Sequence, residues 1–486
     1  MGKKMKDTAN GSSVTSMVLK AMSIFTGVQS VTIICSIVRT KLIALWIGVT
    51  GVGMFATFNT AIDLIAAATQ LNMRQSAIRD VSTSSLSHRS AVVSAVRWWA
   101  LRLGIVGAVF MAFLSPVLSY FSFGCFAYWW TFVLLSVVVF LLSVVNGEYT
   151  VMQGVGALPT LARCTVWGAV LGTVFSIPLY YFLGIGSVLP SIIIFQIAAM
   201  LTATFYKIEK SSPGKRSENI EIGRRFIKLG AFITVPMLLT YLSSYAFISY
   251  LNTAYSTEHT GLYQTGYTLL VRYTGIIFSA LSMEYFPRIT RISMRPKLAS
   301  VVVSHEALII MYVLTPLLII FVAADRLAIH LLYSESFMAA LPFVTVGIMS
   351  MVFKALSYCM AFVILARGDG KVFILTESAS VIVGLSLNIL FFRLYSFTGL
   401  GFSYILWYLF YTIIVYIPYR RYGMKLKTGA INATISSILL VSMAIILKHF
   451  GWGYPLLLLL PALAVSYYGY KKLNKQPIKI FFKKNC

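Results

Sequence analysis

Acidic residues are scarce in this sequence: 14 Asp and Glu stand against 40 Lys and Arg, and charged residues make up only 11% of the chain. Soluble globular proteins carry about a quarter charged residues. With 58% hydrophobic residues, this shortage of charge excludes a soluble protein and indicates a polytopic membrane protein. The basic residues fall between apolar runs and form no single patch, so nucleic acid is not an expected partner.

Cysteine is also rare, and the local motifs of common enzymes are missing. The five cysteines are Cys35, Cys125, Cys164, Cys359 and Cys486, and no metal-ligand spacing relates them. We therefore predict neither a disulfide framework nor a metal site, and no cofactor. The sequence contains no Gly-x-Ser-x-Gly motif, no P-loop and no His cluster with metal spacing, which argues against an enzyme.

Apolar runs long enough to cross a bilayer recur along the chain. A span needs about 20 apolar residues, and on that rule we predict about fourteen membrane helices between residues 18 and 470. The third and ninth are predicted over residues 98–121 and 301–323. With the amino terminus inside, about 33 of the 40 Lys and Arg fall in cytoplasmic segments, which predicts that both termini face the cytoplasm.

Glycine motifs recur at a nearly constant spacing. Gly53 and Gly261 are 208 residues apart, Gly154 and Gly368 are 214 apart, and Gly184 and Gly399 are 215 apart. Because the shift covers six helices, the two halves have the same orientation, as in a parallel repeat about an axis along the membrane normal.

The repeat predicts an all-α polytopic membrane protein with two six-helix lobes around a central cavity. We assign the amino-terminal lobe to residues 1–214, the carboxy-terminal lobe to 215–424, and two additional helices with a basic tail to 425–486. The polar run at 207–228 is interpreted as the linker between the lobes.

Few ionisable residues interrupt the spans, and each costs about 2.5 to 3.5 kcal/mol near the bilayer centre. Arg39 lies in the first span, Asp63 in the second, Arg272 in the eighth and Lys354 in the tenth. Such residues face water, a ligand or a partner, and we interpret Arg39 as the wall of a basic cavity. For Asp63 and Arg272, a buried ion pair between helices is an open alternative.

Other charged residues are placed near the ends of the spans. We predict solvated or interfacial positions for Glu148, Arg163, Glu377, His305 and Glu306, and a position in an outside loop for Lys448.

One local signature accompanies the repeat. Arg39 is followed nine residues later by Gly48 and then by a Gly-x-Gly-x-Phe motif at 51–55. With the six-plus-six lobes and two extra helices, the chain resembles the polysaccharide-exporting, lipid-linked oligosaccharide flippases of the multidrug/oligosaccharidyl-lipid/polysaccharide superfamily. The related lipid II flippases have further arginines in the second span, where this sequence has Asp63 and no basic residue before Arg74.

The resemblance implies that the protein moves a polyisoprenyl-pyrophosphate-linked oligosaccharide from the cytoplasmic to the outer leaflet. It implies a multi-pass protein of the bacterial cytoplasmic (inner) membrane that serves surface polysaccharide assembly, for example of O-antigen. The expected partners are the lipid-linked oligosaccharide, membrane lipids, and a polysaccharide polymerase with other assembly proteins. We expect a monomer.

The resemblance also suggests roles for individual side chains. Arg39, Arg272 and Lys354 would bind the pyrophosphate, since guanidinium groups bind phosphate oxygens bidentately. Asp63 or Glu377 would bind a coupling ion or join an ion pair. Candidate sugar contacts are Asn59, Gln70, Tyr241, Tyr245, Tyr267 and Tyr273, although tyrosine is also common at membrane interfaces.

Four other classes stay open from the sequence. They are a cation-coupled multidrug exporter of the same superfamily, a sugar or metabolite transporter of another fold, a membrane-bound glycan polymerase or other enzyme, and a scaffold protein. The exporter predicts that acidic residues dominate the cavity, whereas the charges within the predicted spans are mostly basic.

Overall fold

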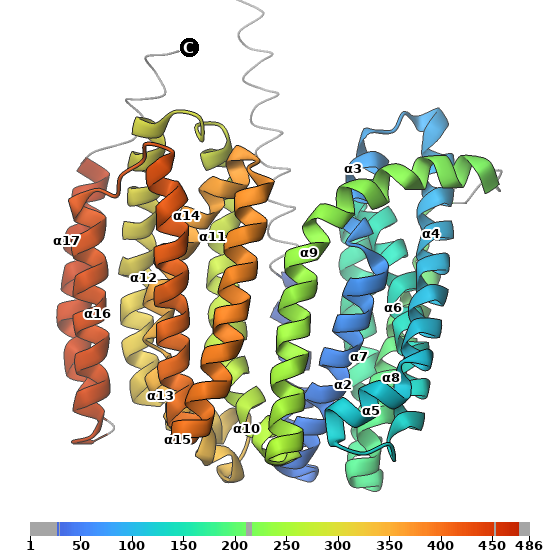
Figure 1. Ribbon diagram of the computed structural model, residues 1–486, viewed down its shortest axis with the longest axis horizontal. Helices are drawn as coiled ribbons and strands as arrows, with labels where there is room; N and C mark the ends of the chain where they lie inside the picture. Colours follow the sequence, from blue (N-terminus) through green and yellow to red (C-terminus); the bar gives the residue numbers. More distant parts are fainter. Residues whose placement is uncertain (1–26, 29, 210–215, 452, 476–486) are drawn as a thin grey trace, which may run out of the picture. The chain divides into compact units, whose positions relative to one another are not determined.

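The computed structural model describes residues 27–28, 30–209, 216–451 and 453–475, and every regular element in these ranges is a helix (Figure 1). Eight of the described helices are long and apolar enough to span a membrane. Two of these, Leu158–Phe205 and Gly370–Arg421, each contain two of the predicted spans. The chain is therefore an all-α polytopic membrane protein, as its sequence predicts.

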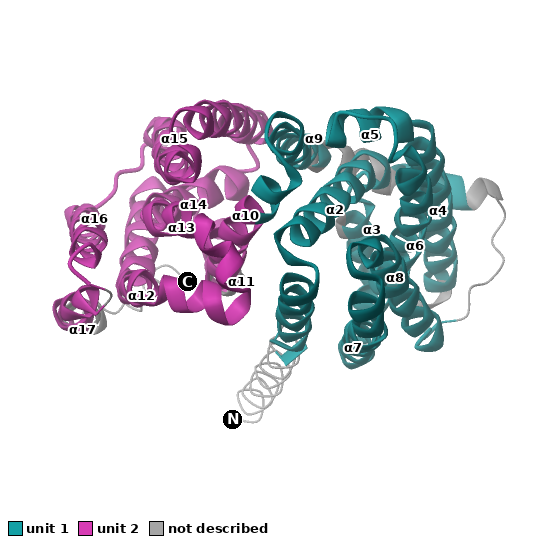
Figure 2. Cartoon of the chain, turned by 90° about the horizontal axis from the view of Figure 1, so that it is seen from below, with its two compact units in different colours: residues 1–261 teal, residues 262–486 magenta. Residues whose placement is uncertain are grey.

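The chain forms two compact units that divide between Gly261 and Leu262 (Figure 2). Unit 1 begins with a helix over residues 30–46, and residues 18–26 of the predicted first span lie outside the described residues. Its further helices are α2 (Gly48–Gln70), α3 (Met73–Thr83), α4 (Leu86–Phe113), α5 (Ser115–Phe123), α6 (Trp129–Gly154), α7 (Leu158–Leu183), η1 (Gly184–Ser187), α8 (Val188–Phe205) and α9 (Arg216–Ala254).

Helix α10 (Thr257–Tyr267) contains the division between the units. Unit 2 continues with η2 (Thr268–Arg272), α11 (Tyr273–Thr290), α12 (Pro296–Leu332), η3 (Glu335–Ala340), α13 (Leu341–Gly347), α14 (Ser350–Arg367), α15 (Gly370–Arg421), α16 (Thr428–Lys448), η4 (Tyr454–Leu458) and α17 (Leu459–Lys475).

Helix α9 packs within unit 1 and begins inside the predicted linker. The sequence assigns 207–228 to a linker, but the chain is helical from Arg216 onward. Trp99 Nε1 donates to the Asn219 carbonyl oxygen at 2.9 Å, and Asn252 Nδ2 donates to Thr57 Oγ1 at 2.8 Å. These bonds fix both ends of α9 on unit 1, whereas the lobe boundary after residue 214 remains a prediction from the repeat.

The backbone reveals the repeat at a spacing slightly different from that of the glycine motifs. Gly156 and Gly368 both end helices with positive φ, at +83° and +71°. Gly184 (φ +51°, ψ −128°) has nearly the same conformation as Ser396 (φ +52°, ψ −135°), which bends α15. Both pairs are 212 residues apart, so the conformational equivalent of Gly184 is Ser396 and not Gly399.

Helix α4 extends well beyond the predicted third span because its charged residues are paired. It begins at Leu86, whereas the apolar run predicts a start near residue 98. Arg97 of α4 donates to both carboxylate oxygens of Glu148 on α6, at 2.8 and 2.9 Å. Glu148 is only 6% exposed, so the predicted solvated position for this residue is wrong.

Helix α12 of unit 2 is also longer than its predicted span and also contains a paired charge. It runs from Pro296 to Leu332, beyond both ends of the predicted ninth span. Glu306, predicted to be interfacial, is 2% exposed and forms an ion pair with Arg288 of α11. A buried charge is tolerated in a packed helix when an opposite charge compensates it.

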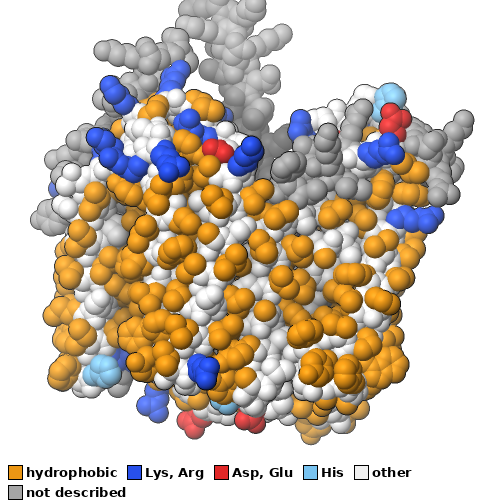
Figure 3. Space-filling view, viewed as in Figure 1, with side chains coloured by type: hydrophobic (Ala, Val, Ile, Leu, Met, Phe, Trp, Pro, Cys, Tyr) orange, Lys and Arg blue, Asp and Glu red, His pale blue; other side chains and the backbone are white. Residues whose placement is uncertain are grey.

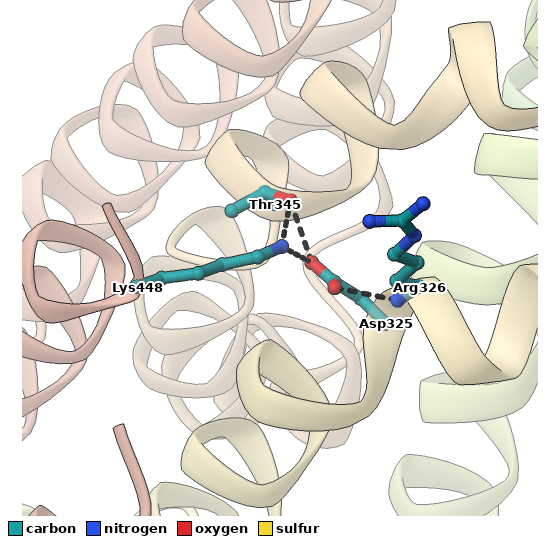
Figure 4. Close-up of polar contacts among 4 residues, drawn as sticks. All are labelled: Asp325, Arg326, Thr345 and Lys448. Atoms are coloured by element: carbon teal, nitrogen blue, oxygen red, sulfur yellow. Dashed lines mark hydrogen bonds and ion pairs between the residues drawn. The ribbon is translucent and has the colours of Figure 1, made fainter. Parts of the chain in front are cut away.

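A third buried ion pair joins α16 to α12 within unit 2 (Figure 4). Asp325 of α12 is fully buried and pairs with Lys448, the last residue of α16. Thr345 Oγ1 donates to the same carboxylate at 2.6 Å, as does the backbone nitrogen of Arg326. Lys448 is therefore part of a buried network, not a free residue of an outside loop as predicted.

The surface has the character expected of a membrane protein. On the face seen in Figure 3, hydrophobic side chains cover a broad band, and most of the visible Lys and Arg lie above it. Large apolar side chains such as Phe113 and Phe205 are 80% and 83% exposed. Apolar exposure of this extent suits contact with lipid rather than water.

We predict that Ser396→Gly stabilises the protein. A serine at positive φ with extended ψ is strained by roughly 1–3 kcal/mol, and glycine removes this strain. The melting temperature of the detergent-purified protein should therefore rise. Ser386→Gly, in the regular part of the same helix, is the matched control and should lower it. A lower melting temperature for Ser396→Gly would contradict the assigned backbone.

We predict that Lys448→Met destabilises the protein by about 3–5 kcal/mol, because it leaves the Asp325 carboxylate buried without a counter-charge. The double variant Asp325→Asn/Lys448→Met should recover most of this loss in a thermal unfolding assay. Arg326→Ala is the control, since its exposed side chain is directed away from the carboxylate. Equal melting temperatures for Lys448→Met and wild type would show that the pair contributes nothing.

Candidate functional site

A cavity of about 340 Å³, which we call the polar chamber, opens within unit 1. Helices α2, α3, α4, α6 and α9 contribute its walls. Its main polar lining residues are Asp63, Gln70, Asn72, Arg74, Asn146 and Tyr241. The volume lies at the lower end of the range of about 300–1,000 Å³ that is typical of small-molecule sites.

The chain is strained where it enters the chamber wall. Leu71 and Asn72 separate α2 from α3, and both have positive φ, at +46° and +45°. Asparagine tolerates this left-handed conformation, but leucine pays about 1–2 kcal/mol for it. The two residues turn the chain so that Gln70, at the end of α2, and Arg74, in the first turn of α3, line the same cavity. Strain of this kind concentrates at functional sites.

Hydrogen bonds hold part of the chamber wall in place. Gln70 Oε1 accepts a bond from Asn146 Nδ2 at 3.2 Å, which joins α2 to α6. Arg74 Nη2 donates to Gln153 Oε1 at 3.3 Å, which joins α3 to α6. Both side chains therefore have defined positions before any ligand binds.

Two amide groups of this wall are unsatisfied. Gln70 Nε2 and Asn72 Nδ2 are buried, and no described residue accepts a hydrogen bond from either. A buried donor without a partner costs about 1–3 kcal/mol, and such groups in proteins are normally paired with protein, water or ligand. The chamber thus presents more hydrogen-bonding capacity than the protein itself uses.

Arg39 lines a different cavity of unit 1, which we call the Arg39 crevice. Its guanidinium carbon lies 4.8 Å from the ring centre of Phe55 and 4.5 Å from that of Phe195. The crevice has a volume of about 230 Å³, and its walls include the small residues Gly168 and Ala199. Contacts with two aromatic faces favour the cation, and the crevice is also lined by the hydroxyl-bearing residues Thr32, Ser36 and Thr165.

Lys354 of α14 lies in an aromatic environment in unit 2. Its Nζ is 5.5 Å from the ring centre of Phe278 and 5.3 Å from that of Tyr408. Among the described residues no carboxylate forms an ion pair with it. Glu377 instead accepts a hydrogen bond from Tyr411, one helical turn from Tyr408. Lys354 is therefore a cation without a protein counter-charge in the described chain.

Arg272 also belongs to unit 2 and lies at a helix irregularity. It is exposed and is the last residue of the π-helical turn η2. Such turns are rare and frequently occur at functional sites. The predicted pyrophosphate set of Arg39, Arg272 and Lys354 is thus divided between the two units, and its assembly into one site stays a prediction.

The predicted sugar and ion residues have diverse surroundings. Asp63, Gln70 and Tyr241 line the polar chamber together. Asn59 Nδ2 donates to the Phe55 carbonyl oxygen of its own helix at 2.7 Å. The Tyr245 hydroxyl lies 2.8 Å from Ser122 Oγ in the core of unit 1.

The two remaining predicted tyrosines belong to unit 2. Tyr267 packs against Tyr263, with ring centres 5.9 Å apart, and Tyr273 follows Arg272 at the start of α11.

Sequence reasoning missed three residues of the chamber. Asn72, Arg74 and Asn146 were not identified as site residues, although they line the cavity with Gln70. The available signal was the polar end of the second span, where Gln70, Asn72 and Arg74 follow one another within five positions.

Comparison with known proteins identifies the family. Residues 46–342, more than half of the chain, match the family model described as "Polysaccharide biosynthesis protein". The chain belongs to this family of polysaccharide biosynthesis proteins. The family resemblance inferred from the sequence is thereby confirmed. No curated protein matches the sequence.

Solved structures show which fold the chain shares. The lipid II flippase MurJ, in an inward closed conformation, has a TM-score of 0.66 at 12% identity, covering 93% of this chain and 98% of MurJ. An inward-facing MATE family multidrug transporter of the MOP superfamily has a TM-score of 0.59 at 15% identity, with 86% of this chain and 94% of the transporter covered.

A MATE transporter of Vibrio cholerae has a TM-score of 0.55 at 15% identity, with 85% of this chain and 98% of the transporter covered. These three similarities show a fold shared with MurJ and MATE proteins.

Proposed function

We propose that this protein is a flippase that moves a polyisoprenyl-pyrophosphate-linked oligosaccharide across the bacterial cytoplasmic membrane for surface polysaccharide assembly. The observation that carries the proposal is the half-buried position of Lys354, a cation in a membrane helix that has aromatic neighbours and no carboxylate partner among the described residues. Membership of the polysaccharide biosynthesis family and the fold shared with the lipid II flippase MurJ support it.

The physical problem of such a substrate explains the need for cations in the spans. The charged, hydrated head cannot enter hydrocarbon without a large free-energy cost, whereas the isoprenoid tail never needs to leave it. A protein solves this by replacing the water around the pyrophosphate with fixed donors. We assign Arg39, Arg272 and Lys354 to this role because charge-assisted hydrogen bonds to phosphate are among the strongest that side chains form.

The transport step follows from the repeat. Two lobes of equal orientation can rock so that the substrate is exposed first to one side of the membrane and then to the other. Arg39, Arg272 and Lys354 would bind the head in both states. On this proposal the protein binds and releases its substrate unchanged, and no residue acts as a catalyst.

A complementation assay tests the proposed pyrophosphate residues. In cells that lack the chromosomal copy, Arg39→Ala, Arg272→Ala and Lys354→Met should each lower surface glycan display at least about tenfold, since one charge-assisted contact contributes about 1.5–3 kcal/mol. Immunoblotting of membranes should show unchanged protein levels. Arg393→Ala, an exposed arginine of α15, is the control and should retain full display. Full display with one of the three variants would remove that residue from the site.

A multidrug exporter is the second candidate, because the chain shares its fold with MATE transporters and Asp63 lines the polar chamber. On this alternative, cells that overproduce the protein should accumulate less ethidium, and Asp63→Asn should restore accumulation. Unchanged ethidium accumulation in the overproducing cells would favour the flippase.

A further inference from the structure

We infer that the polar chamber of unit 1 binds a sugar residue of the transported glycan, at a subsite separate from the cations assigned to the pyrophosphate. The inference rests on the proposed flippase function and adds Asn72, Arg74 and Asn146 to the residues that contact substrate. Asp63, predicted from sequence as a coupling-ion or ion-pair residue, becomes an acceptor for sugar hydroxyls.

The chemistry of the chamber distinguishes among possible ligands. Its lining combines one carboxylate, one guanidinium group, three side-chain amides and a tyrosine: Asp63, Arg74, Gln70, Asn72, Asn146 and Tyr241. A pyrophosphate site would carry an excess of positive charge, but here one acidic and one basic group balance. Among the described residues no cluster of three metal-ligating side chains exists, so a multi-carboxylate cation site is not formed either.

A neutral ligand with many hydroxyl groups fits this set of side chains. Each hydroxyl both donates and accepts, so it can pair with the Asp63 carboxylate and with amide nitrogens at the same time. The unpaired Gln70 Nε2 and Asn72 Nδ2 are the donors that such a ligand would satisfy after rotation of the amide groups. Binding would then provide these two donors with acceptors that no described residue supplies.

The backbone around Asn72 provides a selective substitution. Asn72→Gly removes the amide group and retains a residue that adopts positive φ without strain. Leu71→Gly makes the same kind of change at the neighbouring residue, which has nearly the same backbone conformation but does not line the chamber. The two variants therefore separate loss of the amide from a change in chain flexibility. Arg74→Lys is a second chamber variant that keeps the charge and loses the planar donor group.

The test measures binding of three lipids to the full-length protein in nanodiscs by native mass spectrometry. The probes are a polyprenyl pyrophosphate without sugar, the same lipid with one hexose, and the same lipid with one N-acetylhexosamine. Wild type should bind at least one sugar-bearing lipid about tenfold more tightly than the sugar-free lipid. Asn72→Gly and Arg74→Lys should each remove most of this preference and leave affinity for the sugar-free lipid unchanged. The control Leu71→Gly should leave the affinity for all three lipids unchanged.

Each outcome separates the inference from the function on which it rests. If the sugar-free lipid binds in an Arg39-dependent manner but the sugars add nothing in wild type, the chamber is not a sugar subsite and the flippase proposal stands. If neither chamber variant alters the sugar preference, the subsite lies elsewhere. Thermal stabilisation by sodium ions that Asp63→Asn removes, without sugar preference, would overturn the inference in favour of a cation site. Failure of all three lipids to bind would contradict the flippase proposal itself.

Discussion

Buried ion pairs between different helices are the interaction on which the packing of this chain depends. The pairs are Arg97 with Glu148, Arg288 with Glu306, and Asp325 with Lys448. They join α4 to α6, α11 to α12, and α12 to α16, so each unit contains at least one. Removing one partner of such a pair costs about 3–5 kcal/mol, because the remaining charge stays out of water. The pairs therefore favour one arrangement of helices whose apolar surfaces alone would pack in many ways.

The same pairs explain which parts of the fold the sequence could predict. The positions of the spans follow from length and hydropathy, which are local properties, and the eight long apolar helices among the described residues lie where spans are predicted. The ends of the helices do not follow, because Arg97 in α4 and Asp325 in α12 are compensated by residues distant in sequence. A hydropathy rule counts each of these residues as an uncompensated charge and therefore ends the span too early.

The candidate site was predictable only in part for a similar reason. Gln70 and Tyr241 can be identified as candidates from the sequence because they are polar within apolar runs, and both line the polar chamber. Asn146 becomes a site residue only because α6 packs beside the end of α2, where it bonds to Gln70. Asn72 and Arg74 reach the cavity because the backbone at Leu71 and Asn72 is left-handed. The sequence does not predict this turn, since neither residue is glycine. Convergence of several helices on one cavity is a tertiary property.

The repeated glycines Gly53 and Gly261 have a cause that the repeat alone does not reveal. Neither has positive φ, so conformational freedom does not explain them. They lie together where α2 crosses the part of α10 that belongs to unit 1: a Cβ on Gly53 would lie 2.0 Å from the Thr257 carbonyl oxygen, and one on Gly261 would lie 2.1 Å from that of Val49. Each glycine thus leaves room for the backbone of the other helix. Helix α10 continues from this contact into unit 2. The chain therefore passes from one unit to the other next to two positions, Gly53 and Gly261, where a side chain would clash with the backbone of the neighbouring helix.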